Sequence, residues 1–483
     1  MNTEHLLLCI FPAILLVLML IKIKIAPKGC IHEDFLSLQQ CKIMQGIAAV
    51  CIVFHNLSQY ITNYGNVWKG PITVFSSLGI LFTTIFFFCS GFGLMQSLKT
   101  KPDYLKGFLK KRMPAVWIPF MISNGIYLVW LGMYFGKVDS VIDSLICFFG
   151  FRLLNTNTWF LVEIMILYLA FYFTHRFIKK QKNAMAAMSV FVGIMIIGSL
   201  LLGHDNSEMG GSWFMGEWWY NTTIFFLVGM YVSKYYDKIL AFFKRNYKWL
   251  LPVSVLLFLV TFGLEEYVIR VFGYYKEWEG HPGYGAKLIT LVAQILTCSF
   301  WLLTIMLVSM KVRIKNIVLV LLGKISLEIY VLHEIFRFFF TYEYDRNPVV
   351  LFTWVLVCSI ALAIPLHLFQ RWLIKLITAD KKKTDPEYMT PEKRILEEEK
   401  KKRNRKLAIG AGIITLILSG LVISELYVMY VQPKVYYEEE LGILADAKVG
   451  DVIPFGTMNT DYIKSGDERI FWLVADRQGD KLL

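Results

Sequence analysis

The stretch Met44-Gln-Gly-Ile-Ala-Ala-Val-Cys-Ile-Val-Phe-His55-Asn-Leu-Ser-Gln-Tyr60 decides how the rest of the chain is interpreted. With its flanking residues it forms an apolar helix long enough to cross a hydrocarbon core about 30 Å thick. His55 lies well inside this apolar run. An ionisable side chain at such a depth is costly and by default indicates a functional site. His55 is therefore the first candidate functional residue.

The composition predicts an integral, multi-pass membrane protein. The 483 residues are 56% hydrophobic and 18% charged, whereas an ordinary soluble domain has about 25% charged residues. The first apolar run follows only Glu4 and has no basic leader, so we interpret it as a retained span rather than a signal peptide. We expect twelve spans, at about 5–24, 41–60, 73–98, 113–135, 156–175, 184–203, 217–234, 249–267, 286–309, 316–340, 350–375 and 407–430.

The distribution of basic residues predicts the orientation of these spans. The loops on one side hold 35 Lys and Arg residues, and the loops on the other side hold 7. Cytoplasmic loops carry the excess of positive charge in membrane proteins, so the N-terminus and the C-terminal tail are expected outside. The net charge of +13 is therefore a sign of topology, and we expect no nucleic-acid partner.

The predicted fold is an all-α polytopic membrane protein with a small extracytoplasmic β-type tail. The apolar segment 139–154 is too short for a span and is expected to be an outer-surface or re-entrant helix. The tail has strand-like runs and a hairpin signal, and because it stops in what should be the next strand, we expect a larger outer domain. The predicted divisions are an extra N-terminal span (1–34), a ten-span core (35–376), a charged cytoplasmic linker (377–406), a C-terminal span (407–430) and the outer tail (431–483).

The eight cysteines fall mostly in or beside apolar spans and have no metal-type spacing. They indicate neither a disulfide framework nor a zinc site, so no metal is expected. Free cysteines that pack as small hydrophobic side chains are the simpler interpretation.

Several ionisable residues share the predicted outer half of the membrane. His55, Glu163, His333 and Arg337 come from three different spans, and Glu334 follows His333 directly. Buried charges are paired or face a polar cavity, so this common depth predicts such a cavity. Each residue also has a structural alternative, because a histidine can bond two helices and Glu334 can pair with Arg337.

Three adjacent cations, Lys110, Lys111 and Arg112, lie at the predicted inner end of the third core span. Such a group suits a polyanionic ligand such as a nucleotide or pyrophosphate. The alternative is that the three residues anchor the helix at the cytoplasmic membrane surface. The sequence alone favours this simpler alternative.

Five stretches in order resemble the membrane acyltransferase-3 family. Gln45-Gly-Ile-Ala is followed by His55 as in the first family motif, and the second stretch ends with Ser90-Gly-Phe. The remaining three are Phe108-Leu-Lys-Lys-Arg112, Trp159-Phe-Leu161 and Gly323-Lys-Ile-Ser-Leu-Glu-Ile-Tyr330-Val-Leu-His333. The resemblance covers about residues 35–375.

This resemblance implies a ten-span O-acyltransferase that uses acyl-CoA, usually acetyl-CoA, as a co-substrate from the inner side and holds no bound cofactor. The implied acceptor is a hydroxyl of an outward-facing envelope glycan or lipid-linked sugar. The first-span histidine is the expected catalytic residue, which carries over to His55, and Arg112 with Lys111 and Lys110 is expected to serve the donor. Candidates for the acceptor or supporting cavity are Glu163, Trp159, His333, Ser90 and Tyr330.

Two positions depart from the family pattern. Gln45 stands where the family has a basic residue, with Lys42 nearly one turn earlier, and Ala115 stands where a second arginine is common. The tail is similar to the start of an uncharacterised module of bacterial surface proteins.

Two other functions stay open at the level of the sequence. A transporter or flippase of glycan precursors also needs a polar cavity, although no inverted repeat of broken helices is visible. A catalytically inactive, acyltransferase-like anchor for the outer domain is the third possibility. Oligomeric state, acceptor and acyl chain length do not follow from the sequence.

Overall fold

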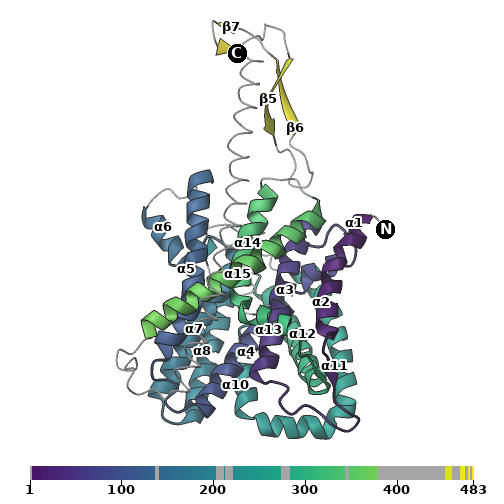
Figure 1. Ribbon diagram of the computed structural model, residues 1–483, viewed down its shortest axis with the longest axis vertical. Coiled ribbons are helices and arrows are strands. Elements are labelled where there is room, and N and C mark those ends of the chain that lie inside the picture. Colours follow the sequence, from purple (N-terminus) through teal and green to yellow (C-terminus); the bar gives the residue numbers. More distant parts are fainter. Residues whose placement is uncertain are drawn as a thin grey trace, which may run out of the picture. The chain divides into compact units, whose positions relative to one another are not determined.

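The chain folds as a helical bundle followed by short strands (Figure 1). The computed structural model describes residues 3–135, 141–202, 211–212, 221–273, 283–342, 347–378, 452–458, 468–473, 477–478 and 481–482. The described helices are α1 (Thr3–Leu8), α2 (Ile10–Leu20), α3 (Leu38–Thr62), α4 (Gly79–Thr100), α5 (Phe108–Phe135), α6 (Val141–Phe148), α7 (Trp159–Phe177), α8 (Gln181–Leu201), α10 (Ile224–Lys234), α11 (Tyr236–Phe272), α12 (Tyr284–Lys311), α13 (Ile317–Lys324), α14 (Ser326–Tyr342) and α15 (Pro348–Thr378), with the 3-10 turns η1 (Ile72–Ser77) and η2 (Thr156–Thr158).

Seven of the described helices are long and apolar enough to span a membrane, namely α3, α4, α7, α8, α11, α12 and α15. The other predicted spans up to residue 340 coincide with α1–α2, α5, α10 and α13–α14. The predicted span 407–430 and most of the predicted linker lie outside the described residues. The protein is thus a multi-pass helical membrane protein, and the total of twelve spans stays a prediction.

Two short strand pairs join loops that the charge pattern assigns to the same side. β1 (Lys24–Ile25) pairs antiparallel with β4 (Val312–Arg313), and both lie in predicted inner loops. β2 (Arg152–Leu153) pairs with β3 (Gly211–Ser212), and both lie in predicted outer loops. These pairings agree with the predicted relative sidedness of the loops. The assignment of the first side as the cytoplasm rests on the loop charges.

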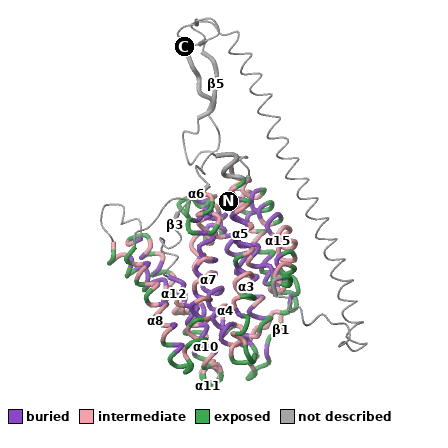
Figure 2. The backbone as a smooth tube through the Cα atoms, turned by 90° about the vertical axis from the view of Figure 1, so that its left-hand side faces the viewer, coloured by how far each residue is buried: buried purple, intermediate pink, exposed green. Residues whose placement is uncertain are grey.

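The helices α3, α4 and α7 lie at the centre of the bundle. Buried residues follow α3, α4 and α7, whereas α11 is largely exposed (Figure 2). The exposed side chains of α11 include Leu256, Leu259 and Val260, as expected of a helix that faces lipid. The central helices therefore supply the polar interior, and the outer helices shield it.

Glycines set the closest helix contacts. A Cβ atom on Gly46 of α3 would lie 2.6 Å from the backbone nitrogen of Gly323 in α13, and one on Gly323 would overlap the carbonyl of Lys42. Helices approach this closely only where small residues face each other. Gly91 of α4 and Gly229 of α10 make a similar contact against backbone atoms. The motif glycines at 46, 91 and 323 therefore have a packing role.

The predicted span 316–340 is two helices rather than one. α13 ends at Lys324, α14 begins at Ser326, and Ile325 between them has φ −103° and ψ 15°. The Ser326 hydroxyl donates to the Gly323 carbonyl at 3.2 Å, which satisfies one carbonyl at the break. The break changes the direction of the chain just before the buried polar residues of α14.

α5 contains two prolines, and one of them explains a contact with α15. Pro119 has no N–H group, so the carbonyl of Ala115, four residues earlier, lacks its helical donor. The Gln370 side-chain amide donates to this carbonyl at 2.5 Å. Gln370 therefore replaces the missing helical bond and ties α15 to α5.

The remaining predictions concern short elements. α6 has eight residues, about 12 Å of helix, so segment 139–154 does not contain a span, as predicted. In a separate unit, β5 (Val452–Met458) pairs antiparallel with β6 (Glu468–Leu473), and β7 (Arg477–Gln478) pairs with β8 (Lys481–Leu482). The predicted strands and the predicted hairpin are therefore present in the tail.

Candidate active site

His55 lies near the end of α3 and is held by the turn that precedes α4. Its Nδ1 donates to the carbonyl of Phe75 at 2.9 Å. Because a carbonyl only accepts, Nδ1 carries the proton of the neutral ring, and the lone pair is on Nε2. The imidazole is therefore oriented by a backbone carbonyl of the turn before α4.

Gly79, the first residue of α4, makes room for this ring. A Cβ atom there would lie 2.6 Å from Cδ2 and 2.8 Å from Cε1 of His55, and still closer to Nε2. Any side chain at position 79 would displace the imidazole. The edge of the ring that carries the Nε2 lone pair thus faces Gly79. The sequence did not reveal this role of Gly79.

His333 of α14 belongs to the same polar cluster. Its Nδ1 donates to the Tyr330 carbonyl at 2.7 Å, and its Nε2 accepts from the Asn56 side-chain amide, also at 2.7 Å. Both nitrogens of His333 are therefore used. Within the described residues, the backbone contacts of the His55 ring are with Phe75 and Ser76 of the turn before α4. The two histidines are close enough to interact electrostatically. His333 is thus a positioned neutral side chain beside the more reactive imidazole of His55.

Glu334 and Arg337 form the ion pair that their spacing predicted. The Arg337 guanidinium contacts Glu334 through Nε at 2.7 Å and through a second nitrogen. It also lies over the rings of Phe338 at 4.4 Å and Tyr60 at 5.4 Å. The group of His55, Asn56, His333, Glu334 and Arg337 is called the outer cluster below.

Glu163 of α7 is fully buried and lies apart from the contacts that hold His55. Thr223 donates to its Oε1, while Oε2 has no hydrogen-bond partner within the described residues. It interacts electrostatically with Tyr330, whose hydroxyl donates to the Asn157 carbonyl. Trp159, one turn before Glu163, packs its ring against those of Phe87 and Phe160.

The predicted inner cations separate into two groups. Lys110 and Lys111 are exposed at the start of α5, whereas Arg112 is half-buried. Arg112 donates from Nε to the Tyr104 hydroxyl at 3.1 Å and interacts with Tyr168. Tyr168 in turn is hydrogen-bonded to Ser90 of α4, so this predicted residue lies at the inner site rather than beside His55.

Two residues of the inner site, buried Glu328 and half-buried His367, were missed from the sequence. Glu328 of α14 is 1% exposed, and its Oε1 accepts from Nδ1 of His367 in α15 at 2.7 Å. The Lys42 ammonium of α3 acts electrostatically on Glu328 and on Arg112. In the sequence, Glu328 and His367 each appear as an ionisable residue in the inner part of a predicted apolar span, at a similar depth in the membrane. Lys42, Arg112, Glu328 and His367 are called the inner cluster below.

The two clusters are separated along the bundle. Lys42 and His55 are thirteen residues apart on one helix, which corresponds to about 20 Å. Between them lies an enclosed void of about 10 Å³, roughly the size of one water. Its lining comes from four helices: Ile52, Thr83, Phe86, Phe160, Leu327 and Tyr330. The void is too small to hold a substrate.

The acyltransferase domain of the acyltransferase-3 family matches the chain over residues 41–368. That range is more than half of the chain and contains both clusters. The chain belongs to the acyltransferase-3 family. It is accordingly an acyltransferase. No curated protein and no solved structure matches it.

In this acyltransferase the inner cluster contains a cation close to position 45, where the chain lacks the basic residue of the family. Lys42 lies one turn before Gln45 on α3, and it is the side chain that interacts with Arg112. At the second departure, the Ala115 carbonyl is occupied by Gln370. A cation is therefore present at the inner end of α3, although one turn away from the family position.

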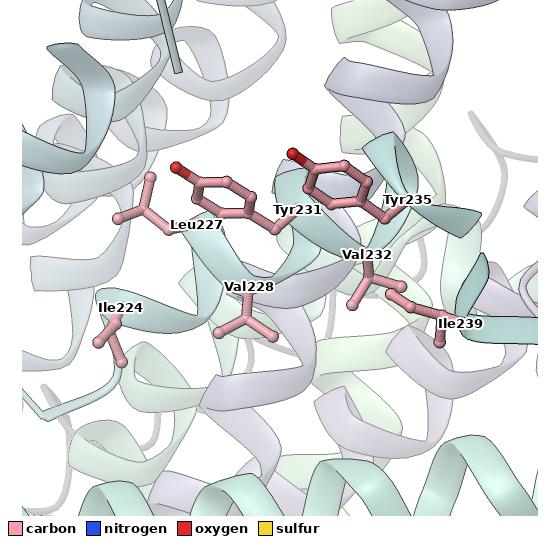
Figure 3. A pocket seen from close by; sticks show the side chains of 7 residues that line it. All are labelled: Ile224, Leu227, Val228, Tyr231, Val232, Tyr235 and Ile239. Carbon is pink, nitrogen blue, oxygen red and sulfur yellow. The ribbon is translucent and has the colours of Figure 1, made fainter. Parts of the chain in front are cut away.

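The acyltransferase also has an apolar groove of about 360 Å³ along α10 and the start of α11 (Figure 3). The rings of Tyr231 and Tyr235 lie side by side on one side of it. None of the residues that line the groove belongs to the inner or outer cluster. Its position on a membrane helix and its apolar lining fit contact with lipid chains.

Proposed function

We propose that this acyltransferase moves an acyl group, acetyl in the simplest case, from cytoplasmic acyl-CoA to a hydroxyl of an envelope glycan or lipid-linked sugar. The observation that carries the proposal is the geometry of His55. Its Nδ1 is occupied by the Phe75 carbonyl, and its Nε2 faces Gly79 as an available base.

The donor end is assigned to the inner cluster. Lys42 and Arg112 are two cations that repel each other. One carboxylate, that of Glu328 on α14, attracts Lys42. Buried charges are usually balanced, so an excess of positive charge suits an anionic ligand such as the phosphates of CoA. Exposed Lys110 and Lys111 extend the same charge to the membrane surface.

The reaction at His55 has two balanced forms. In direct transfer, Nε2 removes the proton of the acceptor hydroxyl as its oxygen attacks the thioester carbonyl; the C–S bond breaks, and the proton passes to the CoA thiolate. In the stepwise form, Nε2 attacks the thioester carbonyl and the C–S bond breaks, which releases the CoA thiolate. The hydroxyl oxygen then attacks the acyl-imidazole, the acyl C–N bond breaks, and the hydroxyl proton passes to the thiolate. Both forms give an ester and the thiol of CoA.

The acceptor end is assigned to the outer cluster and to Glu163. Asn56, His333 and Arg337 offer polar groups beside His55, and Glu163 offers one carboxylate oxygen without a partner within the described residues. Sugar hydroxyls both donate and accept hydrogen bonds, so they are suited to such a mixed set. The excess of basic residues in the opposite loops supports an outer position for this cluster.

The test is release of CoA from acetyl-CoA by the purified protein. His55→Ala should lower the rate by about 100-fold or more, the usual contribution of a positioned general base or nucleophile. His32→Ala, a histidine outside both clusters, should keep the parent rate. Equal rates in the parent protein and His55→Ala would remove His55 from the chemistry.

A further inference from the structure

Glu328 is the buried carboxylate of the inner cluster, and the proposed reaction gives it no contact with the donor. It lies on α14 in the third residue of the helix, and its side chain is directed toward α15. His367 holds one of its oxygens at 2.7 Å. Within the described residues, the other oxygen, Oε2, is buried and has no hydrogen-bond partner.

A purely structural carboxylate should use both oxygens, because a buried acceptor without a partner costs free energy. Lys42 acts on Glu328 only through its charge, since neither oxygen accepts a hydrogen bond from it within the described residues. Oε2 is therefore a fixed acceptor at an otherwise cationic site. A hydrogen-bond acceptor at this position favours a ligand group that donates a hydrogen bond. It does not favour phosphates, because their oxygens are acceptors too.

The position of Glu328 indicates which part of a ligand meets it. Its neighbours Leu327 and Tyr330 on the same helix line a small void together with Ile52 of α3, which lies between Lys42 and His55 in the sequence. Glu328 thus lies on α14 between the inner cations and the level of His333 in the outer cluster. A CoA thioester has amide N–H groups between its phosphates and its sulfur.

We propose that Oε2 of Glu328 accepts a hydrogen bond from an amide N–H of the donor's pantetheine arm, and that His367 is a positioning residue that fixes the carboxylate. The proposal rests on the proposed function, because it assumes an acyl-CoA donor. It assigns the two chemical halves of that donor to different residues. Lys42 and Arg112 bind the phosphates, and Glu328 binds the uncharged arm that carries the acyl group to His55.

The experiment measures binding of three probes to the full-length protein: CoA, pantetheine and the adenosine bisphosphate fragment of CoA. Glu328→Gln puts a side-chain amide N–H in the place of Oε2. This N–H would face the amide N–H of the pantetheine arm, and two donors cannot form a hydrogen bond. The substitution should weaken pantetheine and CoA by about tenfold or more and leave the nucleotide fragment unchanged. Glu33→Gln, an exposed carboxylate of the inner loops, should change none of the three.

Variants of His367 test the positioning role. His367→Gln keeps an N–H donor and should bind pantetheine nearly as the parent protein does, whereas His367→Leu should lose about as much affinity as Glu328→Gln. Glu328→Asp, which keeps the charge but shortens the side chain, should show the same selective loss if Glu328→Gln folds poorly.

Three results would overturn the proposal. Unchanged pantetheine binding in Glu328→Gln and Glu328→Asp would show that the carboxylate does not contact the arm. Equal loss of pantetheine and nucleotide binding would indicate a structural role for Glu328. If the parent protein binds none of the probes, the acyl-CoA donor of the proposed function fails first, and this inference fails with it.

Discussion

Replacing Gly79 with alanine is the sharpest local perturbation of the site. The added Cβ would lie 2.6 Å and 2.8 Å from two carbons of the His55 ring, well inside the contact distance of about 3.5 Å. The ring must therefore move by roughly 1 Å, which weakens its 2.9 Å bond to the Phe75 carbonyl. Misplacement of a catalytic group by that distance costs about 100-fold in rate, or roughly 2.7 kcal/mol in activation free energy.

The assay is CoA release from acetyl-CoA, combined with a thermal unfolding curve for each variant. Overpacking at Gly79→Ala should also destabilise the fold by about 1–3 kcal/mol. Gly93→Ala on the same helix is the matched control, because a Cβ there meets nothing within 4 Å. It should keep the parent rate and be as stable or slightly more stable, since alanine is the better helix former. Parent-like activity in Gly79→Ala, or equal loss in Gly93→Ala, would refute the reasoning.

Three further substitutions test the surroundings of the site. Lys42→Met should raise the KM for acetyl-CoA about tenfold with little change in kcat, whereas Gln45→Met should change neither; the reverse pattern would assign donor binding to position 45. Gly46→Ala should lower the unfolding free energy by about 1–3 kcal/mol, because the new methyl group meets the backbone of Gly323; an unchanged melting temperature would contradict the close contact. Gln370→Leu should cost about 1–3 kcal/mol, because it leaves a helix carbonyl without a donor; the melting temperature measures the loss, and no loss would mean that the bond is dispensable.

The sequence predicted the helical spans and their relative sidedness better than the contacts between them. Long apolar runs and asymmetric loop charge act locally, so each span up to residue 375 coincides with a helix or a pair of helices. The break at Ile325 was not predicted, although Gly323 lies two residues before it, because the apolar run continues on both sides of the break. The start of α11 at Tyr236, well before the predicted residue 249, was missed because its first turns are polar.

For the candidate site, the sequence predicted the kinds of residue involved better than the contacts between them. His55 and His333 were recognised because ionisable residues are rare in apolar helices, and the structure brings them together. Lys42 was noted only for its position nearly one turn before Gln45, and its contact with the inner cluster was not predicted. Glu328 and His367 were missed because their contact joins helices that only tertiary packing brings together. The same holds for Gly79, whose role depends on the absence of a side chain beside an imidazole 24 residues earlier.

We propose that His55 transfers an acyl group to a glycan on the outer side of the membrane. The most direct measurement is mass spectrometry of envelope glycans from cells that produce either the parent protein or His55→Ala at equal levels. The account predicts acyl esters on the glycans of cells with the parent protein and their loss in His55→Ala. Equal acylation in the two, or no acyl ester that depends on the parent protein, would contradict it.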